Sequence, residues 1–159
     1  LVDADLRDAA QSLSKHTLMI DEFLMREIEA GSIQQTQFTQ EEKKIKLHGH
    51  CYQKAFHLVG YTERLLSFPK NYQVEVIPSG CCGMAGSFGY EEEHYEVSMK
   101  VGELVLLPAV RATDEKTLIA AAGTSCRHQI KDGTGRRSYH PVEILYDALA
   151  GSARTKTKN

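Results

Sequence analysis

The spacing of apolar residues predicts several helices along the chain. Between residues 14 and 30, apolar side chains recur at steps of three and four, which indicates an amphipathic helix. Gly31 follows at a position where glycine commonly ends a helix. Apolar residues also predict a helix over residues 52–67 and a longer one over residues 90–113, where we expect a break at Pro108. Between these helices lie shorter segments with the character of β-strands.

Short segments between the helices are typical of β-strands, the first of them with alternating polar and apolar residues. They cover residues 43–48, 74–77 and 117–122, with a shorter fourth candidate at 136–139. Each of the first three runs into a turn and then a helix, and a last helix starts at Pro141. This alternation predicts an α/β fold, a Rossmann-like and mostly parallel sheet of three to four strands flanked by helices. We expect one domain over residues 1–150 and a disordered tail over residues 151–159.

Composition and charge exclude several classes of function. The chain has 159 residues, is 42% hydrophobic, and carries 19 basic against 21 acidic residues, a net charge of -2. This balance gives no support for general binding to nucleic acid or to an anionic membrane. The apolar stretches are far shorter than the ~18 residues that a membrane span needs. No signal peptide opens the chain, which begins at Leu1, so we expect it to be a piece of a longer protein.

The positions of the cysteines carry the strongest chemical information. Four cysteines are too few for a disulfide-rich secreted scaffold, and the usage predicts a reduced, intracellular protein. Cys51, the adjacent Cys81 and Cys82, and Cys126 each follow a predicted strand and lie near the start of a helix. The carboxyl ends of parallel strands meet at one edge of a sheet, where ligands bind. We therefore expect all four thiols to converge there, beside helix N-termini that favour the thiolate form.

Converging thiols could serve three chemistries, or none if they are ordinary buried cysteines. Four cysteine thiolates can hold an iron–sulfur cluster, and they can also hold a tetrahedral zinc ion. Thiol–disulfide or sulfenate redox chemistry is the third choice. The chain has no CxxC pair, which weakens the zinc interpretation. The adjacent Cys81 and Cys82 suit a larger cluster, in which neighbouring thiolates reach different metal atoms.

Glycines and histidines near the cysteines are further candidates. The backbone N–H groups of Gly83 and Gly86 could donate hydrogen bonds to sulfur, although both glycines could simply serve a tight turn. Four histidines lie near the predicted site: His48, His50, His128 and His140. Each could be a ligand, but a histidine in a turn is more often a structural hydrogen-bonding residue. Nucleotide binding and hydrolase chemistry lack a matching motif.

With these residues in view, the chain resembles a known family. Gly80-Cys81-Cys82-Gly83 is similar to the signature of the cysteine-rich CCG domain found in heterodisulfide reductase and in the iron–sulfur subunits of glycolate oxidase and anaerobic glycerol-3-phosphate dehydrogenase. That family has a lone cysteine, then CCG, then CxxC, an order that Cys51, Cys81, Cys82 and Cys126 follow. Five segments also resemble the C-terminal part of bacterial FAD-linked D-2-hydroxyacid dehydrogenases: His48–Lys54, Gly80–Tyr90, Pro108–Arg111, Gly123–Ile130 and His140–Glu143.

The resemblance covers roughly residues 15–150 and implies a function. It implies that the chain is the C-terminal domain of a larger oxidoreductase, with FAD on an upstream domain and a further iron–sulfur half between them. Cys51, Cys81, Cys82 and Cys126 would hold an iron–sulfur cluster of the 4Fe–4S type, with Gly83 and Gly86 shaping its pocket. Electrons would pass from the flavin to a downstream acceptor. The implied location is cytoplasmic, or peripheral at the inner membrane through the full-length enzyme.

One departure from the family pattern affects the ligand set. Where the family has CxxC, this chain has Cys126-Arg-His-Gln129, which leaves four thiolates. A four-thiolate cluster, a cluster assisted by His128, and a zinc-substituted site remain the alternatives. The second functional hypothesis is therefore a structural zinc module that docks a flavin domain onto a partner, and the third is a metal-free thiol switch.

Overall fold

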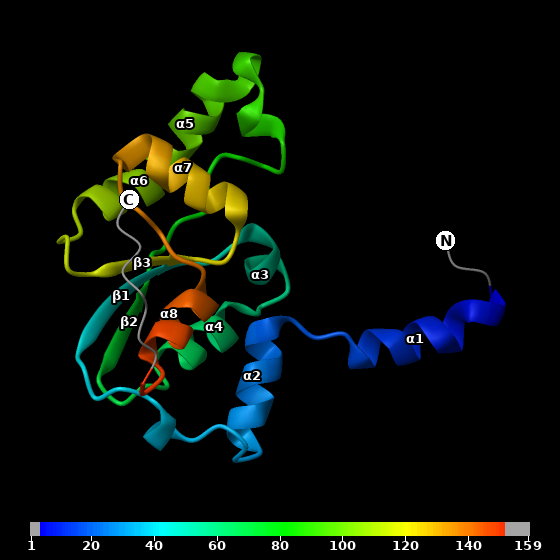
Figure 1. Ribbon diagram of the computed structural model, residues 1–159. Coiled ribbons are helices and arrows are strands. Elements are labelled where there is room, and N and C mark those ends of the chain that lie inside the picture. Colours follow the sequence, from blue (N-terminus) through cyan, green and yellow to red (C-terminus); the bar gives the residue numbers. More distant parts are fainter. Residues whose placement is uncertain (1–3, 152–159) are drawn as a thin grey trace.

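A parallel three-stranded sheet forms the centre of the protein. The structure is a computed structural model that describes residues 4–151, with strands β1 (Lys43–His48), β2 (Tyr72–Val76) and β3 (Leu118–Ala121). Their order is β2-β1-β3, and both neighbours of β1 are parallel to it. The predicted α/β fold with a parallel sheet is thereby confirmed (Figure 1). Of the tail expected over residues 151–159, residues 152–159 lie outside the described residues.

Helices cover both faces of the sheet. The α-helices of the described residues are α1 (Arg7–His16), α2 (Ile20–Glu29), α3 (Cys51–Ala55), α4 (Val59–Leu66), α5 (Tyr95–Glu103), α6 (Leu106–Arg111), α7 (Thr124–Thr134) and α8 (Pro141–Ala148). Short 3-10 turns lie at Ala4–Leu6, Gln35–Gln37, Phe88–Tyr90 and Glu92–His94. In Figure 1, α5, α6 and α7 lie on one side of the sheet, and α2, α4 and α8 on the other. This two-sided cover is the usual environment of a parallel sheet.

Side-chain alternation along the strands divides the core into two clusters. In β3, Ala120 packs into the cluster on the side of α4 and α8, together with Ile45 and Leu47 of β1. Its neighbours Ile119 and Ala121 face the opposite side and pack into the cluster on the side of α6 and α7. All five of these residues are fully or almost fully buried. Period-two alternation therefore lets one short strand supply both hydrophobic layers.

Two of the expected helices are interrupted. The helix predicted over residues 14–30 is split by the non-helical residues 17–19, where Met19 has an extended backbone at φ -68 and ψ 151. The helix predicted over residues 52–67 is split between α3 and α4, where His57 has a left-handed φ of 57. Apolar spacing continues through both breaks, so the pattern alone could not locate them.

The predicted break at Pro108 is wrong, and the fourth strand is smaller than expected. The long helix breaks instead at residues 104–105, and Pro108 lies in the first turn of α6, where a missing N–H costs no intrahelical hydrogen bond. The candidate strand at 136–139 is reduced to a single parallel bridge between Tyr139 and Ala120.

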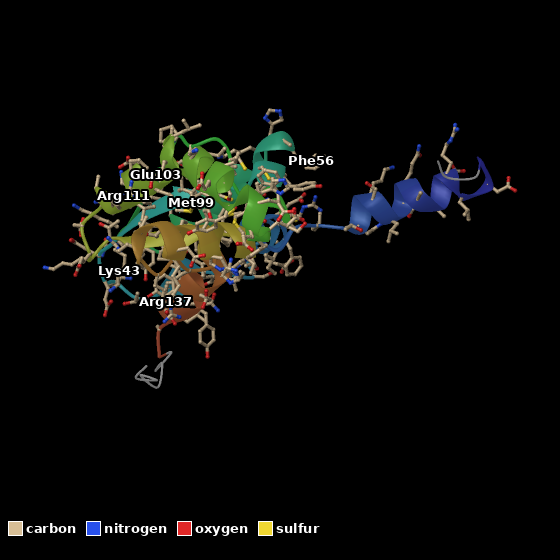
Figure 2. The ribbon with its side chains drawn as sticks, turned by 90° about the horizontal axis from the view of Figure 1, so that it is seen from above. Lys43, Phe56, Met99, Glu103, Arg111 and Arg137 are labelled. Atoms are coloured by element: carbon tan, nitrogen blue, oxygen red, sulfur yellow. The ribbon has the colours of Figure 1, made fainter. Side chains whose placement is uncertain are left out.

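The first helix stands apart from the rest of the molecule. Figures 1 and 2 both show α1 extending away from the body, and none of its residues is buried. Its last turn is followed by the extended link into α2, which packs on α4. Among the described residues, no helix combines the length and the apolar character needed to cross a bilayer.

Candidate metal centre

All four cysteines line one pocket at the carboxyl edge of the sheet. The pocket has a volume of about 320 Å³, and its lining comprises His50, Cys51, Tyr52, Cys81, Cys82, Ala85, Gly86, Ser125 and Cys126. Cys51 begins α3, the adjacent pair lies in the loop after β2, and Cys126 lies in the first turn of α7. The expected convergence of the thiols is confirmed, because the segments that follow the three strands bring all four cysteines to the same edge.

The four thiols differ in depth. Cys126 and Cys82 are buried, with 1% and 5% of their surface exposed, whereas Cys81 is half-buried and Cys51 is exposed. All four are free thiols. The site therefore has two thiols at its base and two nearer its mouth, and any bound group would be reached from the side of Cys51.

Two positive-φ glycines shape the loop that carries the adjacent cysteines. Gly83 has φ +103, and a Cβ there would lie 2.0 Å from the carbonyl oxygen of Ser98 on α5. Its backbone N–H donates a hydrogen bond to Cys81 Sγ at 3.3 Å. Gly86 has φ +74, lines the pocket, and has open space around its Cα. Both positions have a positive φ, which glycine adopts more readily than other residues. At Gly83 the close approach of α5 also leaves no room for a side chain, whereas Gly86 has room for one.

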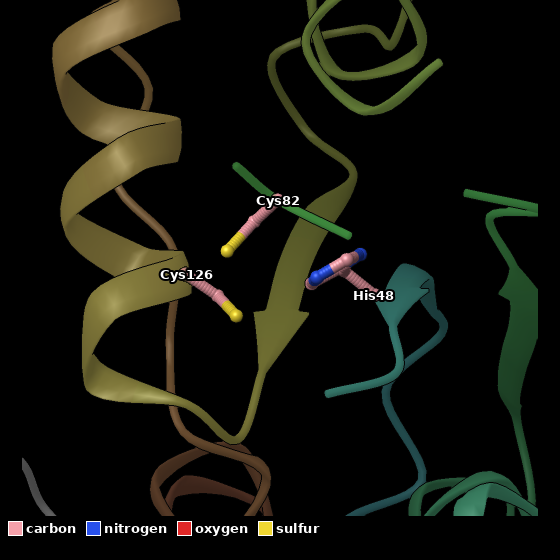
Figure 3. Close-up of side chains that lie close together, drawn as sticks. All are labelled: His48, Cys82 and Cys126. Carbon is pink, nitrogen blue, oxygen red and sulfur yellow. The ribbon is translucent and has the colours of Figure 1, made fainter. Parts of the chain in front are cut away.

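His48 brings an imidazole to the base of the pocket. It ends β1, is 1% exposed, and its Nδ1 lies 2.7 Å from Ser79 Oγ. Its Nε2 is buried without a hydrogen-bond partner. Ligand atoms of His48, Cys82 and Cys126 lie within 4.8 Å of one another, and Figure 3 shows the ring and both sulfur atoms facing a common space. The sequence identified His48 only as one of several candidate histidines.

Two other candidate histidines have different surroundings. His128 is exposed on α7, is not among the pocket-lining residues, and its Nδ1 lies 2.7 Å from the hydroxyl of Tyr90. His50 does line the pocket, where its Nδ1 accepts the backbone N–H of Tyr52 at 3.2 Å and caps α3. The structure therefore brings His48 and His50, and not His128, to the cysteines.

Lys54 is a residue of the site that the sequence analysis did not single out. Its ammonium, one turn after Cys51, donates hydrogen bonds to the carbonyl oxygens of Ser79 and Gly80, the latter at 2.7 Å. Burial lowers the pKa of Lys54, while the nearby thiols, when ionised, raise it, Cys126 most strongly. The only sequence indication was its place at the end of the resembling segment His48–Lys54.

The pKa values of the two deepest thiols are shifted in opposite directions. The neighbouring Cys126 thiol lowers the pKa of Cys82, whereas burial opposes this effect. The same interaction, together with burial, raises the pKa of Cys126. The pair therefore favours one thiolate at Cys82, which is the form that binds metal and attacks electrophiles.

A buried polar network supports the start of α3. Asp21 on α2 is 4% exposed and accepts hydrogen bonds from Thr62 and from Gln53, whose Nε2 is 3.0 Å from Asp21 Oδ2. Gln53 Oε1 in turn accepts the backbone N–H of His50 at 3.1 Å. The network links α2, α3 and α4 directly behind Cys51. Sequence patterns do not reveal it, because these partners are far apart in the chain.

The donor set of the pocket suits a soft metal group. Four thiols and one unpartnered imidazole nitrogen converge there, and thiolate and imidazole ligands select zinc, copper and iron–sulfur centres over hard cations. The positive ends of α3 and α7 and the Lys54 ammonium favour negative charge in the same space. The residues present therefore fit an iron–sulfur cluster and also a single zinc ion.

Comparison with known proteins gives partial matches. No protein-family model matches the chain, and no solved structure matches it. One subunit of the anaerobic glycerol-3-phosphate dehydrogenase of Escherichia coli K12 is 31% identical over 109 residues, 67% of this chain and 26% of that protein. D-2-hydroxyglutarate dehydrogenases of Escherichia coli K12 and Pantoea ananatis are 38% and 34% identical over 79 and 77 residues.

The matches cover only a small part of the length of each relative. The chain spans about a quarter of the glycerol-3-phosphate dehydrogenase subunit and less than a tenth of the D-2-hydroxyglutarate dehydrogenases. Its homologues are thus oxidoreductases of two kinds, each considerably longer than the region that it matches.

Proposed function

We propose that this chain is an iron–sulfur electron-transfer domain of a larger dehydrogenase. Cys51, Cys81, Cys82 and Cys126 would hold the cluster, which we propose to be of the 4Fe–4S type. The observation that carries the proposal is the convergence of all four thiols on one pocket of about 320 Å³. A cluster bound by four cysteine thiolates accepts and releases single electrons at a potential set by its surroundings.

The residues of this chain have distinct roles in that proposal. Cys82 and Cys126 bind from the buried base, and Cys51 and Cys81 from the mouth. The Gly83 N–H lowers the negative charge on Cys81 Sγ through its hydrogen bond, and Lys54 offsets negative charge while fixing the loop before Cys81. The exposed edge at Cys51 is where electrons would enter or leave, because the other ligands lie deeper.

The partners and the substrate are proposed from the homologues. The D-2-hydroxyglutarate dehydrogenases and the anaerobic glycerol-3-phosphate dehydrogenase, by their names, are enzymes that oxidise an alcohol group. We propose that the longer protein oxidises a D-2-hydroxyacid with FAD on an upstream domain. This chain would take electrons from the flavin, by way of a further upstream iron–sulfur domain, and pass them to a downstream acceptor.

A metal analysis of anaerobically purified protein tests the proposal. We expect about four iron and four sulfide per chain and a brown visible chromophore. Cys82→Ser should lose the chromophore, whereas Ser125→Ala, at another pocket-lining position, should retain it. An undiminished cluster in Cys82→Ser would contradict the ligand assignment. One zinc per chain without colour, in wild-type protein that also fails anaerobic reconstitution with iron and sulfide, would support the structural zinc module instead.

A further inference from the structure

The base of the pocket contains a histidine nitrogen whose bonding capacity is unused. Only 1% of the surface of His48 is exposed, and its Nε2 is buried without a hydrogen-bond partner. Buried polar atoms without partners are rare, because each loses the hydrogen bonds it would make in water. Among the described residues, Ser138 Oγ is the one other buried side-chain N or O atom in this condition. The nitrogen of His48 is distinguished by what it faces, namely the thiols of Cys82 and Cys126.

The tautomer of His48 leaves a lone pair on that nitrogen. Its Nδ1 lies 2.7 Å from Ser79 Oγ, and the Ser79 hydroxyl is placed to donate to the carbonyl oxygen of Ile77 at 3.5 Å. A hydroxyl that donates its proton to a carbonyl accepts at its oxygen, and from this pairing we assign the ring proton to Nδ1, which donates to Ser79. Nε2 is then unprotonated. An outer hydrogen bond at one ring nitrogen is the usual means of preparing the other for a metal.

The spacing of the three atoms approaches that of a tetrahedral metal site. The ligand atoms of His48, Cys82 and Cys126 lie within 4.8 Å of one another. Zn–S bonds near 2.3 Å and Zn–N bonds near 2.0 Å imply ligand separations of roughly 3.5–3.8 Å, so closing by at most about 1.3 Å completes the arrangement. Each ligand comes from a different structural element: the end of β1, the loop after β2 and the first turn of α7.

The surroundings leave room for this closure and a fourth position. A Cβ on Gly123 would lie 3.0 Å from Cys126 Sγ and 2.4 Å from His50 Cδ2, so glycine there keeps the space beside Cys126 open. The side of the base that faces the pocket is lined by Cys51 and Cys81, either of which can complete four ligands.

We propose that His48 Nε2, Cys82 Sγ and Cys126 Sγ form a binding site for one soft divalent transition-metal ion, of which Zn²⁺ is the representative. The site rests on the proposed function in one respect, since two of its ligands are thiols proposed for the cluster, and the single ion and the cluster are therefore alternative occupants of this pocket. His48 is thereby a metal ligand at the deep end of the pocket, beside the thiols of Cys82 and Cys126.

Titration with Co²⁺, a coloured substitute for Zn²⁺, tests the site on the reduced, metal-free chain under anaerobic conditions. We expect one Co²⁺ per chain, with thiolate-to-cobalt charge transfer and tetrahedral ligand-field bands. His48→Gln should weaken binding at least tenfold and change the ligand-field bands. His128→Gln, at an exposed histidine outside the pocket, should leave both within twofold of wild type. Equal affinity and spectra in His48→Gln and wild type would overturn the proposal.

A measurement on wild-type protein identifies the histidine ligand directly, so its result does not depend on whether the His48 variant folds. With ¹¹³Cd²⁺ bound to ¹⁵N-histidine-labelled wild-type protein, we expect a ¹¹³Cd–¹⁵N coupling at the Nε2 of one histidine. The His48→Gln variant should lose this coupling while its circular dichroism spectrum stays the same as that of the wild type. A cadmium site with sulfur ligands alone in wild type would overturn the proposal. These outcomes are separate from those of the proposed function, since a chain can fail to assemble iron and sulfide and still bind one ion through His48.

Discussion

Lys54 on α3 donates a hydrogen bond of 2.7 Å from its Nζ to the carbonyl oxygen of Gly80, the residue immediately before the adjacent cysteines. A second hydrogen bond reaches the carbonyl oxygen of Ser79. One side chain thus ties the helix that begins with Cys51 to the loop that carries Cys81 and Cys82. It also places a positive charge beside the pocket that the thiols line.

Removing this charge should make a bound cluster harder to reduce. Reduction adds negative charge, which the Lys54 ammonium stabilises, so Lys54→Met is expected to shift the midpoint potential to a more negative value. Lys54→Arg keeps the charge and should retain most of the wild-type potential. A spectroelectrochemical titration of the three reconstituted proteins checks this. A Met variant with the same midpoint as wild type would show that Lys54 acts only as a tether.

The two glycines of the cysteine loop should respond differently to an added methyl group. Gly83→Ala introduces a Cβ at 2.0 Å from a backbone oxygen of α5, in addition to an unfavourable positive φ, whereas Gly86→Ala meets only the backbone cost in open space. We expect Gly86→Ala to reduce the free energy of unfolding by about 1–2 kcal/mol. Gly83→Ala should cost several times more or prevent folding.

Urea denaturation of both variants provides the measurement. The pair is informative because φ is positive at both positions, so the difference isolates the close approach of Gly83 to Ser98. Equal destabilisation would mean that the loop can move away from α5 at little cost.

The order of elements and the convergence of the thiols could be predicted from the sequence because both depend on local patterns. The strand at 43–48 was predicted with the bounds observed for β1, and each cysteine follows a strand closely enough to share its edge. The positions of the helix breaks are harder to predict from the sequence. The break at residues 104–105 and the left-handed His57 have no glycine or proline at the site to mark them.

The identity of the histidine at the site required the three-dimensional structure. His128 is two residues from Cys126 in sequence, yet on a helix that spacing turns it away from the pocket and toward Tyr90. His48 lies on the central strand, and its pairing with Ser79 depends on β2 being the neighbour of β1. Lys54 likewise contacts residues about a strand and a helix further along the chain. Contacts of this kind leave no periodic pattern in one sequence.

Gln53 is expected to control the position of Cys51 through the buried network. It is 3% exposed and joins Asp21 and Thr62 to the backbone N–H of His50. Gln53→Ala leaves the backbone N–H of His50 without its partner and removes one hydrogen bond each from Asp21 and Thr62, which stay bonded to each other. This should cost about 1–3 kcal/mol of unfolding free energy. It should also loosen the start of α3, so that Cys51 reacts faster with a thiol-alkylating reagent.

The matched control for Gln53 is Gln35. That glutamine donates a hydrogen bond to the carbonyl oxygen of Phe68, but it is exposed to solvent. Gln35→Ala should therefore change the free energy of unfolding by less than about 0.5 kcal/mol. Circular dichroism in urea and the alkylation rate of Cys51 measure the two effects. If the two variants behaved alike, the network would have no special role in holding α3.

His140 should make folding sensitive to mild acid. It caps α8, its Nδ1 accepting the backbone N–H of Val142 at 3.2 Å, and burial, reinforced by Arg127, lowers its pKa below the ordinary value of 6.5. As the pH falls through 6.5, His140 therefore becomes protonated in the unfolded chain while it stays neutral in the folded chain. The free energy of unfolding should decrease until the lowered pKa of the folded state is passed, and remain level below it. His140→Asn keeps an N-cap acceptor without a titrating group, so its stability should fall less between pH 8 and pH 5. Urea denaturation of both proteins across that range gives the comparison, and parallel curves would exclude His140 as the source.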